Sequence, residues 1–236
     1  MAMTLDDLVT QLHAAYGARL RSVVLYGSAA AGEQHAGSDH NVLLLLDRVD
    51  TANLAAASAA ARAWRDAGNP PPMTMTVDEW RRSADVFPME YADILERHRV
   101  LHGTAPFADI SVSPGNLRLQ LEQQVMGKLL QLRQGALIAG TDARRQAELI
   151  GASLSTMMVL FRAVVRLHGE QPPDDNAALA ERVGALAGFD AAPFVRAVRH
   201  VRGADVLGGA QATVVLRGYL AGIEQLDAYL DAFPTS

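Results

Sequence analysis

The stretch from Val23 to Leu46 constrains the fold more than any other part of this 236-residue chain. It begins with a short apolar segment, Val23–Tyr26, and ends with a second one, Val42–Leu46. Apolar runs of this length, bounded by turn residues, are typical of buried strands. A Gly-Ser pair, several alanines and a polar segment lie between them. The stretch therefore predicts two buried strands joined by a polar loop.

The polar residues near the two strand ends are suited to phosphate and metal binding. Gly27 has no Cβ, so a phosphate can approach the amides that follow it, and the hydroxyl of Ser28 can donate to a phosphate oxygen. Asp39 and Asn41 are two residues apart and would share one face of a strand, with His40 on the other face. Two aspartates in these places would bind Mg²⁺ for a nucleoside triphosphate. Here the second of them is Asn41.

This arrangement resembles the motif of the nucleotidyltransferase superfamily, which includes DNA polymerase beta, kanamycin nucleotidyltransferase and the minimal nucleotidyltransferases. That motif is a strand, Gly-Ser, a short helix with a Gly, and Asp-x-Asp at the start of the next strand. Gly27, Ser28, Gly32 and Asp39 match it, and Asn41 departs from it. The resemblance implies an α+β domain with a mixed sheet and flanking helices. The alternative is an ordinary α/β turn in which these residues only connect and cap.

The segment FPMEYADILE holds the candidate for a third acidic residue. In minimal nucleotidyltransferases a strand beside the Asp-x-Asp strand supplies that acid, and Glu90 and Asp93 resemble its carboxylates. On that basis Glu90 is the predicted third ligand, on a strand spanning Met89–Leu95. Glu90, Asp93 and Arg97 also follow helical spacing. A helix in which Glu90 has a structural or salt-bridging role is therefore the alternative.

The neighbouring segments predict the rest of this first domain. An amphipathic helix is expected before Gly17, which can end it. An alanine-rich helix over Thr51–Ala67 would connect the second strand to a third at Met73–Val77, as a crossover does. A short helix is expected over Asp78–Ala84. Together these elements predict a nucleotidyltransferase-like domain at residues 1–108.

Beyond about residue 114 the sequence changes to helical periodicity. Helices are predicted from Gly115, from Thr141 or Asp142, and over Asn176–Ala187, Ala192–Arg202 and Ala210–Asp231. Helices joined by short loops form antiparallel bundles, and kanamycin-type enzymes carry such a bundle after the catalytic domain. The second domain is therefore predicted to be an all-helical bundle at residues 114–234.

Bulk properties exclude several classes of function. The net charge of −5 gives the chain no overall basic field to attract nucleic acid. Cysteine is absent, which excludes disulfides, thiolate metal sites and a cysteine nucleophile. The N-terminus lacks a signal-peptide pattern, and no apolar run approaches the ~18–20 residues needed to span a bilayer. We expect a cytoplasmic protein with no membrane partner, and the broad apolar helix faces make a homodimer plausible.

The resemblance implies Mg²⁺-dependent transfer of a nucleoside monophosphate from a nucleoside triphosphate to a hydroxyl of a small molecule or protein. Gly27 and Ser28 would bind the nucleotide. Asp39, Asn41 and Glu90 would form the catalytic and metal site. Asn41 keeps one oxygen ligand but removes a negative charge, so one Mg²⁺ site is expected to be weakened.

Two other functions are alternatives. Asn41 favours a catalytically inactive member of the fold that works as a binding or antitoxin-type protein. Arg162 and His168 match the R-x5-H spacing of HEPN ribonucleases, although an arginine-rich helical protein offers such a match by chance. Arginines such as Arg144 and Arg145 either line a triphosphate cleft or belong to the charged surface of the bundle.

Overall fold

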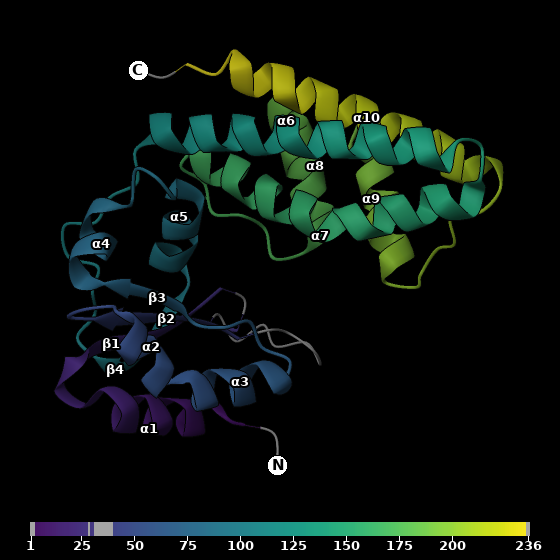
Figure 1. The fold of residues 1–236 in the computed structure, drawn as a ribbon. Coiled ribbons are helices and arrows are strands. Elements are labelled where there is room, and N and C mark those ends of the chain that lie inside the picture. Colours follow the sequence, from purple (N-terminus) through teal and green to yellow (C-terminus); the bar gives the residue numbers. More distant parts are fainter. Residues whose placement is uncertain (1–2, 28, 31–39, 235–236) are drawn as a thin grey trace. The chain divides into compact units, whose positions relative to one another are not determined.

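The computed structural model describes residues 3–27, 29–30 and 40–234. The chain divides into two compact units, residues 1–112 and residues 113–236. The first unit is α+β with a mixed sheet, and the second is all-helical in its described residues (Figure 1). The predicted fold class is therefore confirmed.

Within the described residues, four strands form the sheet of the α/β unit in the order β3-β2-β1-β4. These are β1 (Leu20–Tyr26), β2 (Asn41–Leu46), β3 (Met73–Thr76) and β4 (His98–Gly103). β1 is antiparallel to β2 and to β4, whereas β2 and β3 are parallel. In this register Tyr26 pairs with Asn41 and with His98. The end of β1 and the beginnings of β2 and β4 therefore meet at one edge of the sheet.

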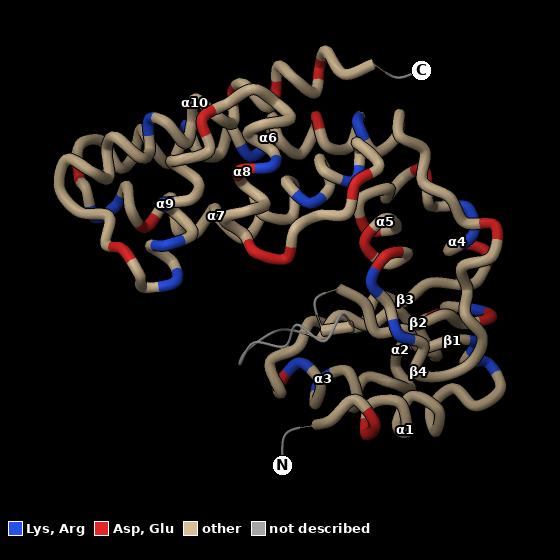
Figure 2. The backbone as a smooth tube through the Cα atoms, turned by 180° about the vertical axis from the view of Figure 1, so that it is seen from behind, with Lys and Arg blue, Asp and Glu red and all other residues tan. Residues whose placement is uncertain are grey.

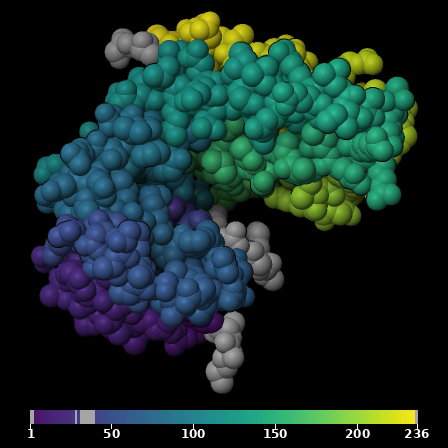
Figure 3. Space-filling model, in the orientation of Figure 1, coloured from purple at the N-terminus to yellow at the C-terminus, as the bar shows by residue number. Residues whose placement is uncertain are grey.

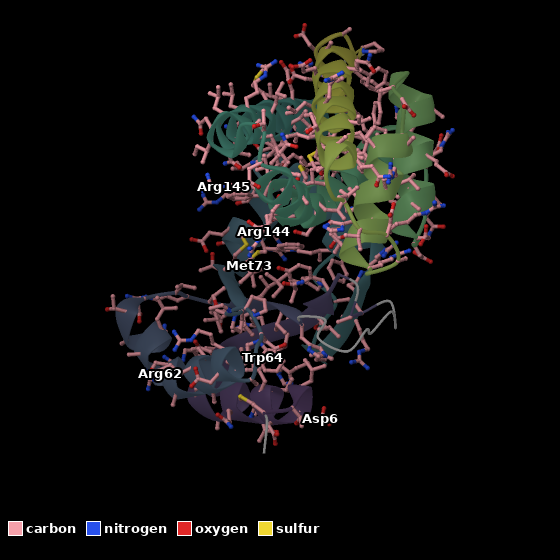
Figure 4. All side chains as sticks on the ribbon, turned by 90° about the vertical axis from the view of Figure 1, so that its right-hand side faces the viewer. Asp6, Arg62, Trp64, Met73, Arg144 and Arg145 are labelled. Carbon is pink, nitrogen blue, oxygen red and sulfur yellow. The ribbon has the colours of Figure 1, made fainter. Side chains whose placement is uncertain are left out.

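Helices cover both faces of the sheet (Figure 1). One face carries α1 (Leu5–Tyr16), α2 (Thr51–Ala56) and α3 (Ser58–Asp66), and the other carries α4 (Val77–Arg82) and α5 (Pro88–Glu96). Along β1, Val23 and Leu25 belong to the first core and Val24 to the second, as the alternation of a strand requires. Trp64, labelled in Figure 4, anchors the first core, and Trp80 anchors the second.

Local sequence signals explain most helix ends in this unit. Thr4 and Asp7 form a capping box at the start of α1, and Thr76 and Glu79 form another at the start of α4. The single helix predicted over Thr51–Ala67 is instead two helices, α2 and α3. The two helices are separated at Ala57, a buried residue whose backbone is not helical. The sequence around it contains no Gly or Pro that would break a helix.

The strand predicted over Met89–Leu95 is wrong, because this segment is helix α5. Pro88 occupies the first turn, where its missing N–H has no intrahelical partner to lose and its fixed φ suits a helix. The Tyr91 hydroxyl donates to the Trp80 carbonyl at 2.6 Å, and the two rings stack at 4.1 Å. The helical spacing of the acidic residues was therefore the correct indication.

The helical unit consists of five helices in its described residues: α6 (Pro114–Ala139), α7 (Ala143–Leu167), α8 (Asn176–Ala187), α9 (Ala192–Val201) and α10 (Ala210–Asp231). Its core contains Phe161 of α7, which packs on Phe194 with ring centroids 5.1 Å apart. Phe194 packs in turn on Tyr219, whose hydroxyl bonds the Ser153 hydroxyl at 3.1 Å. Figure 3 shows the outer surface of the unit, with α10 in yellow.

Among the described residues, helix α7 is the one helix that is both long and apolar enough to be a candidate membrane span. By length and composition it could cross a membrane, and 56% of its most apolar window is buried in the protein. Fully buried side chains such as Met157 and Val164 lie along it. Its composition is thus also that of a core helix.

Candidate functional site

The predicted site residues fall partly outside the described residues. Ser28, Gly32 and Asp39 lie there, so their predicted roles stay predictions. Gly27 and Asn41 are described, and Asn41 pairs with Tyr26, the residue before Gly27. Gly27 follows the last residue of β1, and Asn41 is the first residue of β2.

Gly27 has a backbone conformation that favours glycine. Its φ is +78°, in the left-handed region, and the residue is buried. A Cβ at this position would lie 3.5 Å from Nδ2 of Asn41 and 3.6 Å from Oδ2 of Asp93. An amide from β2 and a carboxylate from α5 therefore converge on a backbone position that carries no side chain.

The last turn of α5 is attached directly to the end of β1. The Gly27 N–H donates to the Arg97 carbonyl at 3.0 Å, and the Arg97 N–H donates to the Asp93 carbonyl at 2.9 Å. The next residue, His98, begins β4 and pairs with Tyr26. These backbone bonds hold Asp93 at the Gly27 end of the sheet.

The pKa of Tyr26 is raised at this end of the sheet. Burial raises the pKa of Tyr26 to about 12, with further contributions from the charges of Asp93 and then Glu90. The tyrosine is therefore neutral at physiological pH. Figure 2 shows acidic positions on α5 in red. Asp93 and Glu90 thus act electrostatically on the same strand end that precedes Gly27.

Glu90, the predicted third ligand, is an exposed residue in the first turn of α5. It lies on a helix and not on a strand beside β2. β2 lies between β3 and β1, and neither of their sequences, MTMT and LRSVVLY, contains an acidic residue. Of Glu90 and Asp93, Asp93 is the one with a carboxylate oxygen 3.6 Å from the Cβ position of Gly27.

The described residues around Gly27 are better suited to bind Mg²⁺ that is already coordinated by a nucleotide than to form a metal site from protein ligands alone. No group of three His, Asp or Glu side chains that could hold a metal occurs in the described part of the chain. Asp93 offers a carboxylate oxygen, the kind of ligand Mg²⁺ prefers, whereas Asn41 turns its amide nitrogen, a hydrogen-bond donor, toward the Gly27 position. Mg²⁺ usually takes one or two carboxylates and completes its shell with phosphates and water. This donor set therefore fits the metal when a triphosphate supplies the remaining oxygens.

Comparison with solved structures places this geometry in a known fold. Spectinomycin adenyltransferase AAD(9) from Enterococcus faecialis, solved with ATP and spectinomycin, matches with a TM-score of 0.58 and 9% sequence identity. The match covers 93% of this chain and 98% of that one. The chain has a nucleotidyltransferase-like fold. At this identity the likeness concerns the fold alone.

A toxin–antitoxin structure with AMP-PNP is also similar, at 19% identity, with 57% of this chain and 96% of that chain covered. Its TM-score of 0.30 is too low to establish a common fold. No family model matches the sequence, and no curated protein matches it.

His40 lies at the start of β2 and faces the α3 side of the nucleotidyltransferase-like sheet. Its N–H donates to Oδ1 of Asn69 at 3.1 Å, and its ring Nδ1 lies at the same distance from that oxygen. The ring centroid is 5.9 Å from that of Trp64. His40 is half-buried, and its contacts lie with Asn69 and Trp64.

The arginines considered for a triphosphate cleft have acidic partners within the helical unit. Arg118 pairs with Glu122 at 2.8 Å, and Arg133 pairs with Glu224 at 2.7 Å. Arg144 and Arg145, labelled in Figure 4, pair with Glu148 and Asp142 respectively. These contacts agree with the charged-surface alternative.

The two residues of the HEPN-type match have different partners. Arg162 donates to Oδ1 of Asn176 at 2.8 Å. Nε2 of His168 hydrogen-bonds with the Tyr229 hydroxyl at 2.7 Å, and their rings stack. The packing of these side chains within the helical unit accounts for both residues without a shared site.

Helix α6 exposes an apolar stripe that bears on the predicted homodimer. Leu119, Met126, Leu130 and Leu137 follow helical spacing and are 40–84% exposed. They lie away from the buried residues of the same helix, such as Leu121. The homodimer stays a prediction, with this stripe as its first candidate surface.

Proposed function

We propose that the protein binds a nucleoside triphosphate at the Gly27 end of β1. We further propose that it transfers the nucleoside monophosphate slowly to a hydroxyl of a small molecule or protein. The convergence of Asn41 and Asp93 on Gly27 is the observation that supports this function most. A bare backbone position flanked by an amide and a carboxylate allows the close approach that a metal-bound phosphate needs.

Each residue has a defined role in this proposal. Gly27 leaves room for the phosphates, and Ser28 donates its hydroxyl to one of their oxygens. Asp39 and Asn41 offer their side-chain oxygens to the Mg²⁺ that accompanies the nucleotide. When bound, that Mg²⁺ offsets phosphate charge and orients the reacting groups.

The transfer is expected to be slow because negative charge is missing at two places. Asn41 is neutral where the superfamily motif has a second aspartate, and β3 contributes no carboxylate. Fewer charges hold the metal, so its charge compensation for the leaving pyrophosphate is weaker. The same observation favours a second candidate, a protein that binds nucleotide without transferring it.

Calorimetry and a transfer assay on the wild type and on Asn41→Asp separate these two functions. ATP and GTP are titrated with Mg²⁺ or Mn²⁺, and transfer of label from the α-phosphate is followed. Acceptors include the protein itself and spectinomycin, the compound present in the AAD(9) structure. The matched control is Asn69→Asp, which makes the same change at the residue that bonds His40.

The proposed function predicts measurable binding and slow transfer by the wild type. Asn41→Asp should increase both, and Asn69→Asp should increase neither. Binding without transfer in both proteins would favour the second candidate. Absence of binding to the wild type under every metal and nucleotide condition would contradict both.

A further inference from the structure

The exposed apolar stripe of α6 lies along a single line of the helix. Its members, each at least 40% exposed, are Leu119, Met126, Leu130 and Leu137. A helix has about 3.6 residues per turn, so these four side chains point within about 20° of one direction over about 27 Å. The buried residues of α6, such as Leu121, point instead into the core of the helical unit. The stripe is therefore a second apolar surface on a helix that already packs with its other side.

The spacing of the stripe is that of a helix–helix contact. Helices that pair along their length make contact through residues at alternating steps of four and three. From one end of the stripe to the other these steps fall on Leu119, Gln123, Met126, Leu130, Arg133 and Leu137. The stripe is narrower than the broad apolar face of a core helix. The pattern therefore fits one further helix laid along α6.

The stripe is complementary to itself when its direction is reversed. We propose that it binds the same stripe of a second copy of this chain, with the two α6 helices antiparallel. The facing pairs are then Leu119 with Leu137, Met126 with Leu130, and Gln123 with Arg133. Every apolar side chain meets an apolar one, which is the self-complementarity that a symmetric dimer requires. The inference does not depend on the nucleotide site.

The charges beside the stripe also favour this arrangement. A groove between α6 and α10 is lined by the acidic residues Glu122, Asp227 and Asp231, and also by Gln123. Burial, and then the charges of Glu122 and Asp231, raise the pKa of Asp227, as expected where negative charge is concentrated. In the antiparallel dimer, Arg133 of the second copy faces Gln123. Each copy thus brings a positive charge to the acidic groove of the other.

The residues that flank the stripe suit a protein surface better than a membrane. A helix that lies in a membrane interface usually carries Lys and Arg beside its apolar face. Here Gln123, Gly127 and Gln134 flank the stripe, and Lys128, the one lysine of the chain, lies about half a turn away from it. A Cβ added to Gly127 would meet no atom within 4 Å. A glycine in mid-helix lowers helix stability, but it lets a second helix approach closely.

Sedimentation equilibrium of the full chain tests the dimer. The wild type should be dimeric and should dissociate on dilution. Leu130→Gln should weaken dimerisation at least about tenfold, because each dimer loses two buried leucines. The control is Val201→Gln on α9, which changes a side chain of similar exposure, 56% against 49% for Leu130. It should dimerise as the wild type does, and circular dichroism should show that both variants are folded.

Disulfide crosslinking tests the antiparallel register, since the natural chain contains no cysteine. An oxidised mixture of Leu119→Cys and Leu137→Cys should form a covalent dimer between the two variants. Leu119→Cys alone should not, because its two copies would lie about 27 Å apart, whereas a disulfide joins Cα atoms about 4.4–6.8 Å apart. Efficient crosslinking of Leu119→Cys to itself would contradict the antiparallel arrangement.

A charge reversal tests the contribution of the acidic groove. Arg133→Glu places a negative charge opposite that groove and should weaken dimerisation about tenfold or more. Its control is Arg145→Glu on α7, which breaks a surface pair with Asp142 and should have no effect. A wild type that stays monomeric at every concentration would overturn the inference. Equal dimerisation by Leu130→Gln and the wild type would also overturn it. So would a monomer that binds phosphatidylcholine–phosphatidylserine vesicles and loses that binding in Leu130→Gln.

Discussion

The two units of the molecule differ in how well their local sequence signals agree with their structure. In the helical unit, one face of each long helix packs in a shared core, where the Ser153 hydroxyl bonds that of Tyr219, although α6 also exposes apolar side chains and Asp227 buries a carboxylate oxygen without a hydrogen-bond partner. In the α/β unit, the Gly27 end combines a positive φ, an acid in the last turn of a helix and a tyrosine whose pKa is raised to about 12. Proteins violate local rules mainly where function requires it. The proposed function places a chemical role at the Gly27 end and a stabilising role in the helical core.

The largest expected effect is on the stability of the helical unit. Phe161→Ala removes a fully buried ring that packs on Phe189 and Phe194, at a cost of roughly 3–5 kcal/mol in the free energy of unfolding. Both tryptophans, Trp64 and Trp80, lie in the α/β unit, so their fluorescence reports on that unit. Far-UV circular dichroism reports mainly on the helices.

Urea unfolding should therefore shift much more by circular dichroism than by tryptophan fluorescence in Phe161→Ala. Under folding conditions the affinity for Mg²⁺-ATP should match that of the wild type. An affinity that falls together with helical stability would contradict the division of roles between the units.

A substitution at Gly27 should affect binding beyond its effect on stability. Gly27→Ala places a side chain at a φ of +78° and fills the point between Asn41 and Asp93. The backbone strain should cost about 1–2 kcal/mol. Gly68→Ala is the control, because Gly68 has a φ of +92° and a Cβ added there would meet no atom within 4 Å.

Both glycine variants should lose similar stability by tryptophan fluorescence. In calorimetry, Gly27→Ala should lose roughly tenfold or more in nucleotide affinity through one lost charged hydrogen bond, whereas Gly68→Ala should bind normally. Equal affinities in the two variants would remove Gly27 from the proposed site.

Removing one helix cap from each unit should produce smaller and separate effects. Asp142 accepts from the amides of Arg144 and Arg145 at the start of α7, and Thr76 accepts from Glu79 at the start of α4. Asp142→Ala and Thr76→Ala should each cost about 1 kcal/mol. The loss of stability in Asp142→Ala should be detected mainly by circular dichroism. The loss in Thr76→Ala should be detected mainly by tryptophan fluorescence. Equal shifts in both signals for both variants would mean that the units unfold as one.

The last expected effect appears only at alkaline pH. The pKa of Tyr26 is raised from 10.0 to about 12 in the folded protein, first by burial and then by the charges of Asp93 and Glu90. Its contribution to stability is therefore complete below pH 10 and is lost as pH rises from 10 to about 12, since the unfolded chain releases the proton first. Tyr26→Phe should flatten the fall in stability over that range. A fall as steep as in the wild type would mean that Tyr26 does not titrate as described.

The sequence predicts the helical unit almost residue by residue. The predicted bounds Asn176–Ala187 and Ala210–Asp231 are those of α8 and α10. Regular apolar spacing and turn residues at the ends were sufficient there, because each helix buries one face in a single core. The break between α2 and α3 could not be predicted, since alanine-rich sequence favours helix on both sides of it.

The candidate site was predictable only in part. Gly27 and Asn41 could be brought together from sequence because Gly27 follows one strand and Asn41 begins the next. The approach of Asp93 depends on how α5 attaches to β1, which no local pattern specifies. The choice of Glu90 followed from expecting a strand, whereas Pro88 at the first turn pointed to a helix.

Hydrogen–deuterium exchange with and without Mg²⁺ and a non-hydrolysable ATP analogue tests the central claim most directly. If the Gly27 end of the sheet binds nucleotide, peptides containing Gly27, Asn41 and α5 should exchange more slowly with the ligand present. Peptides from α8 and α9 should not change. Protection confined to the helical unit, or no protection at the Gly27 end at saturating ligand, would contradict a nucleotide site at this edge of the sheet.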